Sequence, residues 1–194
     1  MGRPRAVSDD EILAAARRCF LEHGAGVSAG TIASELGVSH TTLFNRYGSK
    51  EALMIAALGP PEDLPWVAEL ERGPDARPIR TQLAAHAQAM AAFFEQLQAG
   101  LAVLHAAGIG RKQAWGRRKG PPPPLQAHRA LVGWLRRAQE QERLGPCDVD
   151  LLASTVIGAL NGWALNARLA GQAGEPPAER LVDLLWNGVR GRRE

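Results

Sequence analysis

The sequence predicts an all-α protein. Apolar residues recur at the 3.6-residue period of a helix along most of the 194 residues, whereas the alternating pattern of a half-buried strand is absent. Hydrophobic residues make up 45% of the chain and charged residues 22%, the balance of an ordinary globular protein rather than a disordered or fibrous one. Glycines and prolines divide the chain into helical segments that can be located by their caps.

The first helix is expected at residues 9–23. Ser8 can cap it, and the three acidic residues that follow suit the positive end of a helix dipole. Gly24 supplies a stop. The side of this helix that is expected to be buried follows the helical period and consists of Ile12, Ala15, Ala16, Cys19 and Phe20.

Three short helices are expected next, because three serines stand where helix caps are needed. Gly37 can adopt the left-handed conformation that ends the first of these helices, and the second runs to Tyr47. A Gly-Pro-Pro run begins at Gly59 and breaks the pattern. The three capping serines are Ser28, Ser39 and Ser49.

The glycine-proline break predicts a boundary between a domain over residues 1–58 and a second domain over residues 59–194. The basic residues at 111–119 and the prolines at 121–124 are interpreted as a linker with a solvated loop. An acidic ligand or DNA is the alternative partner of that basic stretch. Helices of the second domain are expected over residues 77–107, as one segment or two, and over residues 125–143, 148–169 and 178–189.

The helices at either side of Gly37 have the spacing of a helix-turn-helix, in which the second helix enters the major groove of DNA. Leu43 and Tyr47 lie one turn apart and are expected to face the core. The opposite face carries side chains that can hydrogen-bond base edges or contact thymine methyl groups. The predicted base contacts are His40, Thr41 and Phe44.

Other polar groups lie at the edges of this helix pair, where contacts to the DNA backbone fix the position of a reader. The two basic residues at the N-terminus are expected to enter a minor groove as an arm, with a disordered end as the alternative. The formal net charge of +3 does not indicate DNA by itself, because residues 1–58 carry equal numbers of acidic and basic side chains. The predicted phosphate contacts are Ser28, Thr42, Asn45, Arg46, Ser49 and Lys50, and the arm residues are Arg3 and Arg5.

A set of capping, apolar and charged residues recurs at fixed spacing in this segment, namely Ser28, Ile32, Ala33, Gly37, Val38, Ser39, Leu43, Ser49, Lys50, Glu51 and Leu53. At these positions residues 8–58 closely resemble the DNA-binding domain of the tetracycline-repressor-like (TetR) regulators. The resemblance implies a homodimeric protein that binds a near-palindromic operator, most often as a repressor released by a small molecule held in its C-terminal domain. Phe44 stands where the family usually has tyrosine, and Tyr47 where it usually has phenylalanine, so the phenol hydroxyl moves from the DNA side toward the core. Arg46 could then supply the phosphate contact.

The second domain carries aromatic side chains and a few polar groups, the mixture found in ligand pockets and also in ordinary helical cores. Trp115 is expected to fold over this domain and to form a wall of a pocket, since an exposed tryptophan is unusual. The candidate effector-binding residues are His86, Met90, Phe93, His105, Trp115, Trp134, Asn161 and Trp163.

The helix expected at 148–169 is apolar on two opposite faces, which a domain of this size does not easily cover alone. We therefore expect a second subunit, with two glycines one turn apart allowing close approach of a partner helix. The alternative is that these glycines admit a neighbouring helix of the same chain. The residues assigned to the dimer seam are Leu151, Thr155, Gly158, Gly162, Leu165 and Leu169, together with Leu181 and Leu185 of the last helix.

Several classes of protein are disfavoured by the sequence. No nucleophile with its base, no phosphate-binding loop and no cluster of metal ligands stands at a recognisable spacing, so we expect neither an enzyme nor a bound cofactor or metal. The N-terminus lacks the apolar segment of a secretory signal, and polar residues interrupt the uncharged run at 151–167, so a cytoplasmic protein with no membrane span is expected. Two alternatives stay open: a sequence-tolerant DNA-organising protein with the same reader, and an all-α enzyme or carrier with a vestigial reader.

Overall fold

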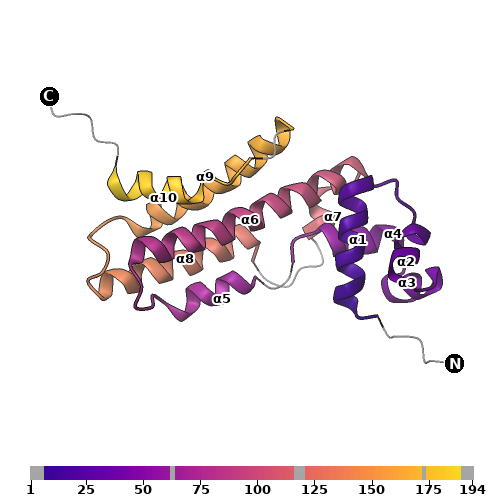
Figure 1. The fold of residues 1–194 in the computed structure, drawn as a ribbon, viewed down its shortest axis with the longest axis horizontal. Coiled ribbons are helices and arrows are strands. Elements are labelled where there is room, and N and C mark those ends of the chain that lie inside the picture. The colour runs from indigo at the N-terminus through magenta and orange to yellow at the C-terminus, as the bar shows by residue number, and fades with distance from the viewer. Residues whose placement is uncertain (1–6, 62–63, 116–120, 172–173, 189–194) are drawn as a thin grey trace. The chain divides into compact units, whose positions relative to one another are not determined.

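The structure is a computed structural model that describes residues 7–61, 64–115, 121–171 and 174–188 (Figure 1). Within these ranges all regular secondary structure is helical, which confirms the predicted fold class. The chain forms two compact units, one from residues 1–61 and 99–118 and the other from residues 62–98 and 119–194. The last part of a long helix, from residue 99 to Ala106, therefore belongs to the N-terminal unit. The predicted boundary at residue 59 stays a prediction.

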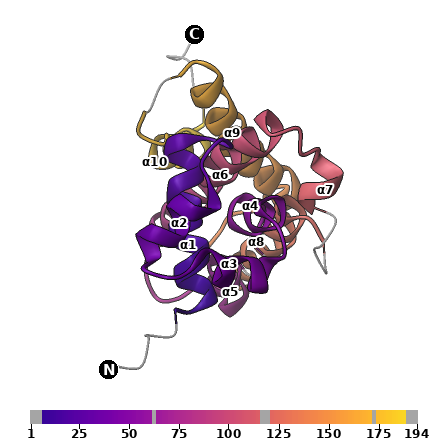
Figure 2. The same ribbon diagram turned by 90° about the vertical axis from the view of Figure 1, so that its right-hand side faces the viewer.

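The first unit contains four short N-terminal helices. They are α1 (Asp9–His23), α2 (Ala29–Leu36), α3 (His40–Tyr47) and α4 (Lys50–Leu58), and α1 packs against both α2 and α4 (Figure 2). Ser8 begins α1 with a capping box, in which its hydroxyl accepts from the Glu11 amide and its own amide donates to the Glu11 carboxylate. The expected bounds of α1 are confirmed.

The core of the first unit joins these helices to the end of a later one. A methyl group at Gly100 would overlap the backbone carbonyl of Leu58, so only glycine permits this close approach. Leu104 is fully buried in the same core. The other large side chains that are fully buried in this unit are Ile12, Phe20, Ile32, Leu43, Leu53 and Leu58.

The second unit is a helical bundle. It contains α5 (Pro65–Arg72), the first part of α6 (Ile79–Ala106), α8 (Pro123–Glu140), α9 (Val149–Leu169) and α10 (Ala178–Asn187). Helix α8 packs against α5 and α9, and α10 packs against α9. Side chains connect α6 to its neighbours: Gln98 donates to Asn161 of α9 over 3.0 Å, and Arg80 pairs with Asp183 of α10.

Two helices were not expected from the sequence. Helix α5 lies in a region to which no separate helix was assigned, because its eight residues give too short a periodic pattern. Helix α7 (Arg111–Trp115) occupies part of the expected linker, so the interpretation of residues 111–115 as a loop was wrong. Its Gly110 amide is bonded to Gln113, and Ala114 is buried in the first unit. None of the described helices has the length and apolar content that a membrane span requires.

Candidate nucleic-acid interface

Three serine hydroxyls fix the starts of α2, α3 and α4, as the sequence predicted. Ser28 accepts from the Thr31 amide at 3.0 Å, Ser39 from the Thr42 amide at 3.2 Å, and Ser49 from the Ala52 amide at 3.0 Å. Each bond satisfies one of the free amides at a helix start. The hydroxyls of Ser28 and Ser39 also lie 2.9 Å from the hydroxyls of Thr31 and Thr42. These two serines can donate to a phosphate oxygen only when the threonine hydroxyl is the donor within each pair.

The turn between α2 and α3 is held by backbone bonds. Gly37 adopts a left-handed conformation with φ 65° and ψ 28°, and its amide donates to the Ser34 carbonyl over 3.2 Å. The Val38 amide donates to the Ala33 carbonyl over 3.0 Å. The turn therefore fixes the direction in which α3 leaves α2.

Helix α3 has one buried side and one exposed side. Leu43 is 2% exposed and anchors the helix in the core of the first unit. On the other side the rings of His40 and Phe44 lie one turn apart with their centroids 4.4 Å from each other. The exposed residues of α3 include all three predicted base contacts, namely His40, Thr41 and Phe44, together with Asn45 and Arg46.

Tyr47 directs its hydroxyl into the protein. The oxygen is buried, has no hydrogen-bond partner within the described part of the chain, and the side chain packs against the core of the first unit. Burial raises the pKa of this phenol, and nearby Asp9 raises it further. This geometry agrees with the expectation that the hydroxyl has moved away from the DNA side.

Arg46 has intramolecular partners that the sequence did not indicate. Its guanidinium donates to the Val7 carbonyl over 2.7 Å and to the Asp9 carboxylate over 2.9 Å. Asp9 and Arg46 are far apart in the sequence, so no local pattern could have paired them. A phosphate contact by Arg46 would therefore have to replace or share this ion pair.

A groove with a volume of about 810 Å³ lies beside α3, between α1 and the turn that joins α2 to α3. Arg46 and Thr42 line it from α3. Arg18 lines it from α1 and pairs with Glu35 at 2.6 Å. Its remaining lining residues are Val7, Glu11, Ala14, Glu35, Leu36, Gly37, Val38 and Ser39.

Glu35 also accepts a hydrogen bond from the buried Cys19 thiol at 2.7 Å. Burial and this bond raise the pKa of Cys19 to about 11, so the thiol stays protonated at neutral pH. The same bonds from Cys19 and Arg18 lower the pKa of the Glu35 carboxyl. The cluster therefore holds α1 to α2 and offers no reactive thiolate.

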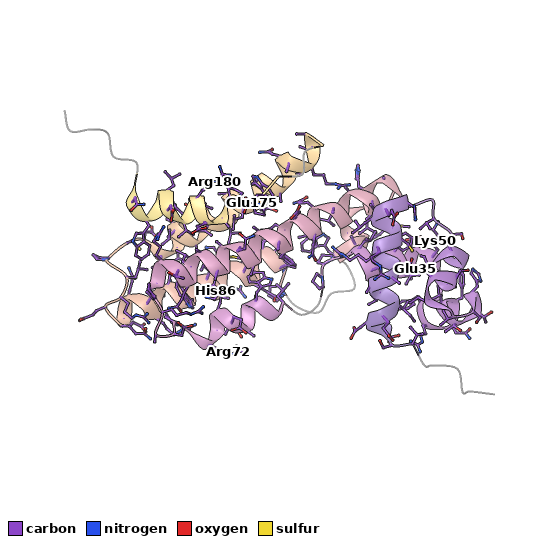
Figure 3. The ribbon with its side chains drawn as sticks, in the orientation of Figure 1. Glu35, Lys50, Arg72, His86, Glu175 and Arg180 are labelled. Carbon is purple, nitrogen blue, oxygen red and sulfur yellow. The ribbon has the colours of Figure 1, made fainter. Side chains whose placement is uncertain are left out.

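Lys50 begins α4 and is labelled with Glu35 on the first unit in Figure 3. It makes no ion pair with any described residue, which leaves its ammonium group available for an anion. The arm residues Arg3 and Arg5 lie outside the described residues. The assignments of base and phosphate contacts stay predictions.

The candidate effector residues do not all belong to one unit. His105 is exposed and belongs to the first unit, and Trp115 packs against the core of that unit. In the second unit, the ring of His86, labelled in Figure 3, meets the edge of Trp134 with centroids 5.2 Å apart. Met90 is fully buried. The partly buried candidates of the second unit are His86, Phe93, Asn161 and Trp163.

Two indole N–H groups of the second unit lack acceptors. Nε1 of Trp134 and Nε1 of Trp66 are buried and have no hydrogen-bond partner within the described part of the chain. Trp134 is fully buried, and the ring of Trp66 contacts that of Phe93 with centroids 5.6 Å apart. Sequence analysis did not select Trp66, because the helix that carries it was not expected.

The predicted seam residues of α9 lie on the exposed side of that helix. Leu151 is 64% exposed and Leu169 is 77% exposed. A methyl group added at Gly158 or Gly162 would meet no atom within 4 Å. Leu165, Leu184 and Trp186 are also large exposed apolar residues, whereas Leu181 and Leu185 of the predicted set are partly buried.

The opposite side of α9 is buried only in part. Leu152, Trp163 and Ala167 are partly buried. The buried residues are Val149, Ala153, Val156, Ile157, Leu160 and Ala164.

Comparison with known proteins identifies the first unit. Residues 12–57 match the model of bacterial regulatory proteins of the tetR family. The segment that matches is therefore a TetR-type DNA-binding domain. The match spans α1 through α4, so the TetR-type helix-turn-helix is the arrangement of α2, Gly37 and α3 described above. No curated protein matches the sequence.

Solved structures of TetR-family regulators share the fold over nearly the full chain. The TetR transcriptional regulator SCO0520 from Streptomyces coelicolor is 26% identical, with a TM-score of 0.59, and the match covers 94% of this chain and 98% of that one. The TetR-family regulator PfmR from Thermus thermophilus is 25% identical, with a TM-score of 0.59 and coverage of 94% and 100%. The reduced form of NemR from E. coli is 17% identical, with a TM-score of 0.62 and coverage of 92% and 95%, a likeness of fold.

Proposed function

We propose that this TetR-family protein is a homodimeric repressor that binds a near-palindromic operator and is released by a small molecule. The observation that carries the DNA-binding part is the exposed side of α3, where His40, Thr41 and Phe44 stand together on a helix anchored by Leu43. Imidazole, hydroxyl and phenyl groups are suited to reading base edges and thymine methyl groups. Lys50 and the serine hydroxyls are proposed to contact phosphates at the edges of this surface.

The dimer is supported by the exposed apolar side of α9. Three leucines and two open glycines would face solvent in a monomer, whereas a second subunit would cover them. A two-fold dimer would also present two short recognition helices to two half-sites of an operator. The same side of α9 is therefore proposed as the seam, with α10 beside it. The seam residues in α9 are Leu151, Thr155, Gly158, Gly162, Leu165 and Leu169.

The protein is expected to select a short palindrome from genomic fragments. Selection followed by footprinting, starting with the DNA upstream of its own gene, should show a protected site with a two-fold repeat. Operator affinity should exceed affinity for random DNA by at least about a thousandfold at physiological salt. A flat affinity that depends on salt and not on sequence would instead favour the DNA-organising alternative. Turnover of a ligand without operator binding would favour the enzyme or carrier.

The effector is proposed to bind the second unit near Trp134 and His86. Burial lowers the pKa of His86, so the imidazole beside Trp134 is neutral at physiological pH. Trp134 adds a buried N–H donor without an acceptor. A mostly apolar molecule with one hydrogen-bond acceptor would satisfy this donor, which is otherwise left unpaired at a cost of about 1 to 3 kcal/mol.

Changing Trp134 to phenylalanine should weaken effector binding about fivefold, the value of one hydrogen bond of about 1 kcal/mol. Trp134 is fully buried, so the smaller ring also leaves a cavity that lowers the unfolding temperature, and effector binding is measured well below that temperature. Binders would come from a thermal-shift screen of small apolar ketones, esters and amides. Trp66→Phe is the matched change at the other unpaired indole.

The effector and the operator are expected to lower each other's affinity for the protein by the same factor. Binders that leave operator affinity unchanged would contradict the proposal that a small molecule releases the DNA.

A further inference from the structure

The Arg46 guanidinium is held by two groups at the N-terminal end of α1. It donates to the Val7 carbonyl at 2.7 Å and to the Asp9 carboxylate at 2.9 Å. Its side chain is 36% exposed and that of Asp9 is 72% exposed, so both groups are accessible from solution. The ion pair therefore lies at the surface, on the same short helix as His40, Thr41 and Phe44.

Arg46 can leave this position without disturbing the core. It lines the open groove beside α3, whose volume is about 810 Å³. The residue that anchors α3 is Leu43, which lies on the buried side of the helix and is only 2% exposed. An exposed ion pair is worth little in water, so a DNA phosphate can compete with the Asp9 carboxylate for the same guanidinium.

We infer that Asp9 is an intramolecular competitor of DNA phosphate for Arg46 and so sets the affinity of the reader for any DNA sequence. In the free protein the Arg46 guanidinium donates to the Asp9 carboxylate. In the complex with DNA it donates to a phosphate oxygen instead. A phosphate contact carries no base information, so the competition lowers affinity for specific and random DNA alike. This inference rests on the proposed DNA-binding function.

The acidic residues of α1 provide a matched control. Asp10 is the next residue, is exposed, and belongs to the same first turn, but it makes no ion pair with any described residue. Asp9→Asn and Asp10→Asn therefore remove the same charge from the same helix end, with the same effect on the helix dipole. Only Asp9→Asn frees Arg46.

The test is a double-mutant cycle between Asp9→Asn and Arg46→Met on full-length protein. Binding to a mixed-sequence 30-base-pair duplex is measured at fixed salt, with circular dichroism to confirm that each variant folds. Asp9→Asn should tighten binding about threefold for each reader, hence about tenfold for two readers, the gain expected from releasing a surface ion pair. Asp10→Asn should change affinity by about twofold or less. In protein that already carries Arg46→Met, Asp9→Asn should change the DNA affinity no more than Asp10→Asn does.

Three results would overturn the inference. Asp9→Asn could weaken binding, which would make the ion pair a strut that positions α3. Asp9→Asn could change DNA affinity by the same factor as Asp10→Asn, which would show that only the loss of one negative charge matters. The larger effect of Asp9→Asn could also persist in the presence of Arg46→Met, which would assign that effect to another group. If the wild-type protein does not bind the duplex even at low salt, the proposed function itself fails, a result distinct from these three.

Discussion

Gly162→Leu is expected to convert the protein from dimers to monomers and to abolish operator binding. A methyl group at this position would meet no atom within 4 Å in its own chain, and the position lies on the exposed side of α9, so we expect the isolated subunit to accept leucine. In a two-fold seam the extra side chain occurs twice and overpacks the interface at about 1 to 3 kcal/mol each, or about 2 to 6 kcal/mol for the dimer. Light scattering should show the monomer mass, while circular dichroism keeps the helical signal.

The matched control is Gly145→Leu. Gly145 lies between α8 and α9, has no atom within 4 Å of an added methyl group, and stands outside the predicted seam. This variant should remain dimeric and bind DNA as the wild-type protein does. A Gly162→Leu protein that stays dimeric with normal operator affinity would exclude this side of α9 from the interface.

The parts of the fold that depend on local signals could be predicted from the sequence. Ser28, Ser39 and Ser49 cap the helices for which they were proposed, and Gly37 adopts the expected left-handed turn. Capping and turns involve neighbouring residues, so their pattern is visible in a single sequence. The same reasoning placed Leu43 in the core and the predicted base contacts on the exposed side of α3.

The parts that depend on distant contacts could not be predicted. Arg46 was predicted to contact phosphate, but its guanidinium pairs with Asp9, which lies 37 residues away in the chain. Trp115 was expected to cover the second domain, but α7 places it against the core of the first unit. The close approach of Gly100 in α6 to Leu58 is another such contact. It depends on packing between segments that are far apart in the chain, so no local sequence pattern indicates it.

His40→Ala and Thr41→Ala are expected to relax the base preference of the reader, each at one position of every half-site. A lost base contact costs about 1 to 3 kcal/mol of discrimination, and the two-fold operator doubles this to about 2 to 6 kcal/mol for the dimer. The rings of His40 and Phe44 touch, so His40→Ala also removes the support of Phe44 and should have the larger effect of the two.

The control for these variants is Lys50→Ala, at the start of α4. A phosphate contact from its ammonium group would strengthen binding to all sequences equally. Lys50→Ala should therefore weaken specific and random DNA alike and reduce the dependence of affinity on salt, with base preference unchanged. Titrations against operator variants at two salt concentrations separate the two behaviours. If His40→Ala weakens every duplex by one common factor, then His40 contacts the backbone or only supports Phe44, and base reading by α3 must depend on Thr41 and Phe44.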